Sequence, residues 1–392
     1  MNKELSKRIK CLQNEITKNN IDAYILTDQD SLLYFTGMAY KPEERVFFMI
    51  VPSKGKPIFL SPKLEEKHLG KITIECEIRA YWEATSAQGE NWYDILETII
   101  RPFKKVGVEN NIAHNILDKI VANEIVILNI VEEMRKIKTP YEIEMIRNTC
   151  KLADLGIENI FKNAYIGASV LEMHTLSGAI QRQLICEKNF DPILTSLTSV
   201  VWPSPISSMP HSIPHLDDKL TKGSNVAMTY FKVNGYAAEC ERTFFLEGPT
   251  TEDREHFNHM INARNISLNL VKPGVKCSDI DIAAREYLIK QGYENNLLHR
   301  TGHGIGLSNH EKPFISIGDD EVLKENMIIS IEPGIYIDEI GGYRHSDTVL
   351  VTKDGYELLT KFPIDMKSMI ITNKNVLSRI KGRYIRSLLK LS

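Results

Sequence analysis

The stretch that decides the fold is TGHGIGL at residues 301–307, which closes on His310 and Glu311. Its alternating glycines are not a dinucleotide-binding fingerprint, because no helix start follows at the required spacing. Three further groups rich in His, Glu and Gly occur in the second half of the chain: MPHSIPH (209–215), GYAAECERT (235–243), and SIEPGIY (330–336) with GGYRHSD (341–347). Buried carboxylates are costly without partners, so one shared polar pocket explains these clusters best.

Taken in this order, the clusters resemble the creatinase/prolidase family, whose C-terminal half has the pita-bread fold. The specific matches are TGHGIGL with His310 and Glu311, IEPGIYI (331–337) and GGYR (341–344). Two earlier segments resemble the N-terminal domain and the interdomain junction of that family, DQDSLLYFTG (28–37) and KIKTPYEI (136–143). The resemblance implies an α+β chain with an N-terminal α/β creatinase-type domain followed by a C-terminal pita-bread domain.

The hydrophobic pattern agrees with two domains and a tail. Residues 1–132 alternate between helical and strand patterns and predict an α/β domain. A catalytic domain is predicted over 139–364, beginning at a helix that Thr139 caps. Within it we expect helices near 170–188, 251–271 and 278–291, and extended stretches near 192–201, 224–247 and 327–352. Blocks of helices and antiparallel-looking strands favour α+β over a doubly wound sheet.

Residues 365–392 form a basic amphipathic C-terminal tail. This stretch has seven Lys and Arg residues and no acidic residue after Asp365, and its apolar residues recur at roughly helical spacing. Two interpretations fit this pattern. The tail is either a terminal helix that docks on its own protein with a solvated basic face, or an element that binds a membrane surface or a partner.

Composition excludes several classes of protein. The 392 residues are 43 % hydrophobic and 25 % charged, with a net charge of −3, so disordered and fibrous classes are excluded. The balanced charge gives no general attraction for nucleic acid. The six cysteines include no CxxC pair, and no apolar run approaches the ~20 residues of a membrane span. We therefore expect a cytoplasmic protein with no membrane span and no nucleic-acid partner.

The resemblance also bears on metal binding. Peptidase members of the family hold two divalent cations with two Asp, one His and two Glu. The matching positions in this chain are, in order, Met228 or Thr229, Glu239, His303, Glu332 and Ser346. Three candidate ligands out of five are too few carboxylates to hold two cations a few Å apart. The sequence therefore predicts no two-metal centre and no cofactor.

The sequence ERT at 241–243 instead resembles the metal-independent, creatinase-like branch of the family. Imidazole exchanges protons near neutral pH, and the resemblance makes His211 the candidate general acid and base. Glu241 and Glu332 would polarise a substrate N–C–N or amide group. His303 completes the candidate catalytic set. The candidate substrate-binding residues are Glu239, His310 and Arg344.

Three functional hypotheses remain open at this point. The first is a metal-independent hydrolase that cleaves a C–N bond in a small, charged, amino-acid-like molecule. The second is an Xaa-Pro dipeptidase or aminopeptidase with a degenerate metal site formed by Glu239, His303 and Glu332. The third is a non-catalytic pita-bread module that binds a partner. The expected ligand is a small molecule or dipeptide-sized substrate, and the resemblance further implies a homodimer.

Overall fold

The computed structural model describes residues 2–40, 43–69, 72–83, 87–372 and 376–388. The chain forms two compact units, residues 1–135 and 136–392. The division falls inside the charged segment 131–140, and the C-terminal helix belongs to the second unit. The finer limits of 1–132, 139–364 and 365–392 stay predictions.

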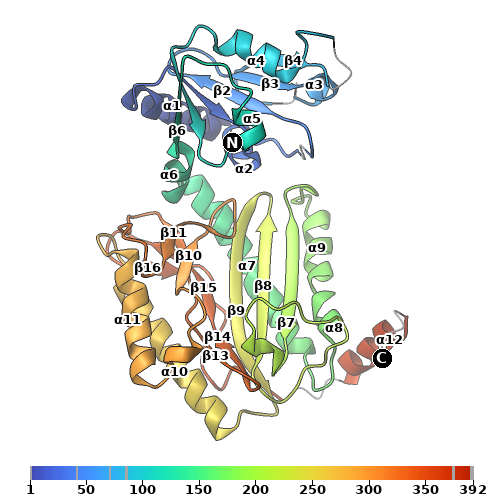
Figure 1. Ribbon diagram of the computed structural model, residues 1–392. Helices are drawn as coiled ribbons and strands as arrows, with labels where there is room; N and C mark the ends of the chain where they lie inside the picture. Colours follow the sequence, from blue (N-terminus) through green and yellow to red (C-terminus); the bar gives the residue numbers. More distant parts are fainter. Residues whose placement is uncertain (1, 41–42, 70–71, 84–86, 373–375, 389–392) are drawn as a thin grey trace. The chain divides into compact units, whose positions relative to one another are not determined.

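The first unit is an α/β domain built on a six-stranded sheet in the order β4-β3-β2-β1-β5-β6 (Figure 1). Its elements are α1 (Asn2–Lys18), β1 (Ala23–Leu26), α2 (Gln29–Thr36), β2 (Phe48–Pro52), β3 (Ile58–Pro62), η1 (Lys63–Glu65), α3 (Glu66–Leu69), β4 (Glu77–Tyr81), α4 (Trp92–Ile100), β5 (Lys105–Glu109), α5 (His114–Leu117), β6 (Glu124–Leu128) and α6 (Ile130–Lys136).

Hydrophobic periodicity explains this unit. The apolar stripe of α1, at Leu5, Ile9, Leu12 and Ile16, is buried along its whole length. β1 pairs antiparallel with β2 and parallel with β5, so the sheet is mixed. The burial of all four residues of β1 fits its central place in the sheet. The expected α/β character of the first domain is confirmed.

The second unit contains a nine-stranded sheet and the two-stranded β13-β14 ribbon. Its elements are α7 (Pro140–Asn163), α8 (Val170–His174), α9 (Ser177–Cys186), β7 (Ser196–Trp202), η2 (Ile206–Ser208), β8 (Asn225–Val233), β9 (Tyr236–Leu246), α10 (Thr251–Leu270), α11 (Cys277–Lys290), η3 (Glu294–Asn296), β10 (Gly302–Gly304), β11 (Glu311–Ile315), β12 (Ile328–Ile331), β13 (Gly334–Ile337), β14 (Gly341–Arg344), β15 (Ser346–Val351), β16 (Tyr356–Leu358), β17 (Ile370–Ile371) and α12 (Val376–Leu388).

The order β11-β10-β12-β15-β9-β8-β7 places strands that are far apart in sequence next to one another. α7 packs on β8 and β9, and α9 packs on β7, while α10 and α11 pack at the end of the sheet that carries β10–β15 (Figure 1). A side chain at Gly156 of α7 would collide with Thr229 and Phe231 of β8, so glycine sets this close approach. The expected α+β pita-bread architecture is confirmed.

The central hairpin β8–β9 carries the buried acidic residues Glu239 and Glu241. Its two strands pair in register from Asn225 opposite Phe244 to Val233 opposite Tyr236. Asn234 and Gly235 form the turn with φ values of 49° and 95°. Positive φ at both turn residues is typical of a type I′ turn, whose twist matches that of the strands.

Three expected elements are divided in the structure, one of them the stretch 224–247, which the turn described above divides into β8 and β9. The helix expected over 170–188 is two helices, α8 and α9, and the Thr175 hydroxyl at the break donates to the Glu172 carbonyl. The extended stretch expected over 327–352 is four strands, because β13 and β14 leave the main sheet to pair with each other. Among the described residues, no helix combines the length and the apolar character needed to cross a bilayer.

Candidate active site

The alternation of side chains along the β8–β9 hairpin builds one wall of the site. Glu239 and Glu241 on β9 line a cavity, together with Met228 on β8. Their neighbours point to the opposite face, since Thr229 bonds the Ala153 carbonyl of α7. This is the two-residue period of a strand. The structure therefore decides between the two candidates for the first lost Asp position: Met228 lies in the cavity, and Thr229 lies against the helix.

His303 reaches the site from the short strand β10, between two glycines. A side chain at Gly302 would overlap the backbone of Ser330, and one at Gly304 would overlap the backbone of Lys312. The glycines thus let β10 lie close against its neighbouring backbone. His303 Nδ1 lies 3.1 Å from the Gly304 carbonyl oxygen, which leaves Nε2 directed at the carboxylates.

The carboxylates around His303 set its charge. Nε2 lies 3.1 Å from Glu332 Oε1 and 3.6 Å from Glu239 Oε1. Burial by itself would lower the pKa of His303, but Glu239 and Glu332 raise it to about 9. Although burial opposes the change, His303 lowers the pKa of Glu332 to about 2. Without a bound cation, the His303 imidazolium and Glu332 are therefore an ion pair at neutral pH, and binding of a cation to Nε2 would have to release its proton.

Glu241 is engaged by the chain itself. Arg344 Nε lies 2.5 Å from one carboxylate oxygen of Glu241, and its Nη2 donates to the other at 2.8 Å. The Arg344 Nη1 donates to the Tyr336 hydroxyl at 3.0 Å. One charge-assisted hydrogen bond and one close ion-pair contact thus hold the two buried groups together. Arg344 therefore takes the place beside Glu241 that the sequence assigns to a substrate cation.

Both carboxylate oxygens of Glu239 also accept hydrogen bonds from the chain, in this case from uncharged side chains. The Ser346 hydroxyl donates to Oε1 at 2.7 Å, and the Asn309 amide donates to Oε2 at 2.8 Å. Ser346 stands on β15 directly opposite Glu241, at the position of a metal-binding Glu in two-metal members of the family. Met228 offers only a soft thioether at the other lost position. The residues present therefore do not fit a pair of hard divalent cations.

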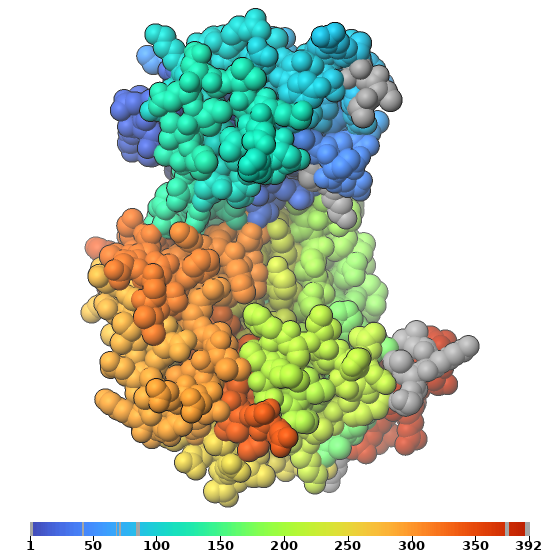
Figure 2. Space-filling model, in the orientation of Figure 1, coloured from blue at the N-terminus to red at the C-terminus, as the bar shows by residue number. Residues whose placement is uncertain are grey.

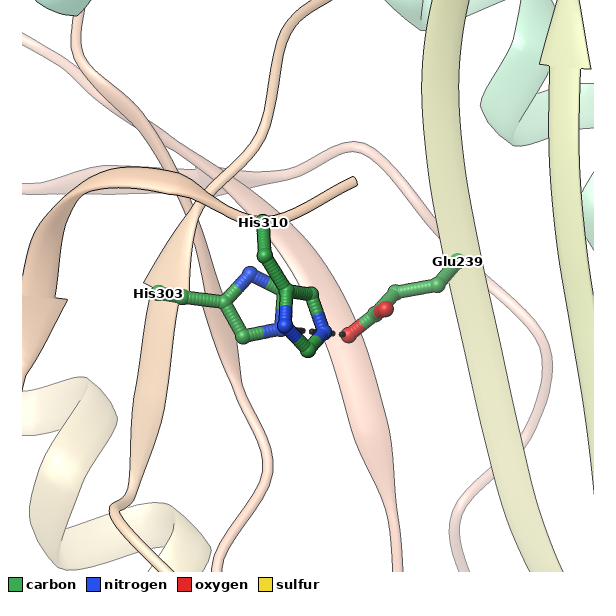
Figure 3. A group of neighbouring side chains, drawn as sticks. All are labelled: Glu239, His303 and His310. Atoms are coloured by element: carbon green, nitrogen blue, oxygen red, sulfur yellow. Dashed lines mark ion pairs between the residues drawn. The ribbon is translucent and has the colours of Figure 1, made fainter. Parts of the chain in front are cut away.

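One cation fits these residues better than two. Glu239, His303 and His310 each offer a donor atom, and these atoms lie within 4.8 Å of one another (Figure 3). An ion with bonds of about 2.1 Å at tetrahedral angles joins donors roughly 3.4 Å apart, so any pair of these donors near the 4.8 Å limit would have to move closer to bind it. The rings of His303 and His310 are 3.9 Å apart between centroids, and they approach Glu239 from the same side. Burial and the neighbouring His303 lower the pKa of His310 to about 4, so its ring is neutral.

The cavity has a volume of about 1090 Å³ and gathers the residues that the sequence singled out. His211, on the loop after η2, is exposed. His211, His310 and Arg344 all line the cavity. Glu239, Glu241 and Glu332 line it as well, and His303 lies in contact with two of them. The structure thus brings all seven predicted residues together, while their individual roles stay predictions.

Sequence reasoning missed four polar residues of the site. His299 Nε2 lies 2.7 Å from the Tyr336 hydroxyl, which in turn accepts from Arg344. Asn309 binds Glu239, and Arg300 lines the cavity with its guanidinium 4.4 Å above the Phe314 ring. Three of the four, at 299, 300 and 309, flank the TGHGIGL stretch directly. Their closeness to that motif is the signal that could have identified them.

Comparison with known proteins gives the family. The model for metallopeptidase family M24 matches residues 144–353, which is more than half of the chain. The chain belongs to family M24. The model for the creatinase/prolidase N-terminal domain matches residues 8–137, so the resemblance drawn from the motifs is confirmed. The chain is therefore a hydrolase of family M24, and this family acts on C–N bonds.

Similar M24 proteins include peptidases and prolidases. An uncharacterized peptidase of Staphylococcus aureus (strain MRSA252) is 28 % identical over 363 residues, covering 91 % of this chain and 99 % of its own length. The prolidase of Pyrococcus horikoshii OT3 is 25 % identical, covers 92 % of this chain and 99 % of its own, and superposes with a TM-score of 0.77. The prolidase of Thermococcus sibiricus is 26 % identical, with coverages of 91 % and 97 % and a TM-score of 0.79.

The fold also occurs in a solved structure that is not named as a peptidase. The N-terminal domain of the FACT complex subunit SPT16 from chickpea superposes with a TM-score of 0.78 at 14 % identity. A shared fold does not by itself settle what a domain does, because function depends on the residues of the site.

Proposed function

We propose that this M24 protein hydrolyses the amide C–N bond of a dipeptide-sized substrate, of the Xaa-Pro class that gives prolidases their name, with one divalent cation rather than two. The observation that carries the proposal is the convergence of Glu239, His303 and His310 on one point of a cavity that His211 also lines. A bound cation would polarise the scissile carbonyl and lower the pKa of a water molecule.

The chain's own residues supply the other functions. His211 is exposed at the cavity, so its ring is free to take a proton from water and to return one to the departing nitrogen. The Glu241–Arg344 pair is buried and rigid, so it serves as a fixed polar wall. Arg300 has a buried Nε without a hydrogen-bond partner in the described part of the chain. We assign Arg300 to the free carboxylate of the substrate.

A second candidate is hydrolysis without metal, and one observation favours it. The His303 imidazolium already lies between Glu239 and Glu332, where a positive charge satisfies both carboxylates. In that case the imidazolium replaces part of the charge that metal supplies in other M24 members. His211 would then activate water alone, and the substrate would be a small, charged, amino-acid-like molecule.

Metal content and activity separate the two candidates. We expect elemental analysis of purified protein incubated with Mn²⁺ to find one ion per chain. We also expect hydrolysis of Xaa-Pro dipeptides to fall with chelator and to return with Mn²⁺. His310→Ala should lose the ion, whereas His215→Ala, exposed on the loop that carries His211 and outside the cavity, should keep it. Two ions per chain would contradict the proposal, and turnover indifferent to chelator would favour the metal-free candidate.

The assignment of Arg300 predicts a change in KM. A charge-assisted hydrogen bond contributes roughly 1.5–3 kcal/mol, so Arg300→Ala should raise KM about 10- to 100-fold and change kcat little. The control is the substrate itself, because a dipeptide with an amidated C-terminus has no carboxylate to bind. We expect the variant and the wild type to hydrolyse that amide with similar KM. An equal loss on both substrates would mean that Arg300 does not bind the carboxylate.

A further inference from the structure

The C-terminal helix α12 docks on its own unit through small and polar residues. Ser378 and Gly382 are its buried positions, and the Ser378 hydroxyl donates to Asn163 at the end of α7. A side chain at Gly382 would collide with Tyr165 and Glu172, so glycine allows the close approach. Arg386 pairs with Glu172 one turn further along. These contacts fix which face of the helix points inward.

The apolar face of α12 consequently points away from the protein. Five large residues share this face and are 56–68 % exposed: Val376, Leu377, Ile380, Tyr384 and Leu388. At 3.6 residues per turn they cover an arc of about 120°, and the buried positions lie on the other side. Both views place α12 at the edge of the second unit (Figures 1 and 2). A terminal helix that served only to cover its own core would be turned the other way.

Basic residues flank the exposed apolar arc. Lys381 lies at one edge and Arg383 at the other, both exposed, and α12 contains no acidic residue. The surface of α12 is therefore strongly positive, although the whole chain has a net charge of −3. In a symmetric pair of such helices the cations of one copy would face those of the other, which is unfavourable. An anionic surface is the complementary partner.

We propose that α12 binds the surface of an anionic lipid bilayer, with its apolar face inserted between headgroups and its basic flanks against lipid phosphates. The arrangement of an apolar face beside Lys and Arg is that of helices that lie in the membrane interface without crossing it. The helix lies outside both family-matched segments, 8–137 and 144–353. The proposed lipid binding is independent of the reaction proposed above.

Co-sedimentation of the full chain with vesicles tests this proposal. We expect binding to phosphatidylcholine vesicles that contain phosphatidylglycerol, weaker binding at high salt, and little binding to pure phosphatidylcholine. Lys381→Gln and Arg383→Gln should each weaken binding about fivefold. Ile380→Asp should abolish it while leaving the thermal unfolding midpoint unchanged, because this side chain is exposed.

The helix α11 offers matched controls. Ile289 and Lys290 are exposed there, so Ile289→Asp and Lys290→Gln change the same residue types outside α12 and should leave vesicle binding intact. The proposal is overturned if the wild-type chain ignores anionic vesicles, if it binds neutral vesicles equally well, or if Ile380→Asp still binds. Sedimentation equilibrium without vesicles tests the alternative that α12 pairs with α12 of a second copy of the chain. A dimer that Ile380→Asp dissociates would show that a second copy, not lipid, covers this face.

Discussion

Replacing Asp347 by Asn is expected to lower the free energy of unfolding of the second unit by about 3–5 kcal/mol. Asp347 is fully buried, and its carboxylate accepts hydrogen bonds from Arg242 Nη2 and Arg264 Nε, each at 2.7 Å. Both guanidinium groups are themselves buried. Asparagine keeps the shape of the side chain but removes its charge, so two cations would remain in the core without an anion. A buried charge that loses its partner costs far more than the pair contributes.

Chemical denaturation, followed separately for the two units, measures this effect. The matched control is Asp354→Asn, because Asp354 lies exposed in the turn between β15 and β16. The two arginines hold the pKa of Asp347 well below its usual range. Its contribution is therefore fully present above the unfolded-state pKa of about 3.9 and is lost only as pH falls below that value. Equal effects of the two substitutions would show that the Asp347 network is not what stabilises this unit.

That the predicted residues lie around one cavity was predictable from the sequence for a physical reason. Glu239, Glu241 and Glu332 lie in or beside apolar strands, and carboxylates in such places need a common polar environment. Ser346 at one lost ligand position was visible once the motifs were aligned with the family pattern, whereas the other position was narrowed only to Met228 or Thr229. Position along the chain and residue type were sufficient for these predictions.

Partner choice within the site was not predictable in the same way. The sequence predicts that Glu241 and Arg344 both belong to the site, but only the register of β9 and β15 and the neighbouring ribbon place them in an ion pair. The direction of α12 is a second case, since its amphipathic pattern predicts a helix but not which face docks. That choice depends on Gly382 and Arg386 meeting Glu172, more than 200 residues earlier in the chain.

The paired charges suggest how this site differs from a two-metal one. Arg344 faces Glu241, and the His303 imidazolium faces Glu332, so two carboxylates are balanced by the chain itself. In a site of that kind, mobilising water depends more heavily on a side-chain base than on cations. His211 and His310 are the exposed imidazoles on the wall of this cavity, and of the two only His310 belongs to the group that gathers around Glu239. Removal of His211 should therefore affect turnover strongly.

His211→Ala is expected to lower kcat about 100- to 10,000-fold, the range that a positioned general acid or base contributes. KM should change little, because the proposed binding contacts come from other residues. The exposed position of His211 means that the unfolding midpoint should stay the same. Steady-state kinetics on an Xaa-Pro dipeptide measures the effect, with His215→Ala as the control on the same loop.

The control distinguishes chemistry from disturbance of the loop. If both substitutions lower kcat alike, the loop shapes the cavity and His211 does not move the proton. If neither does, the base lies elsewhere, and Glu332 cannot replace it readily because its low pKa makes it a weak base. If the wild-type chain binds the dipeptide without cleaving it, the non-catalytic alternative becomes the better account. Only a selective loss in His211→Ala assigns the proton transfer to this imidazole.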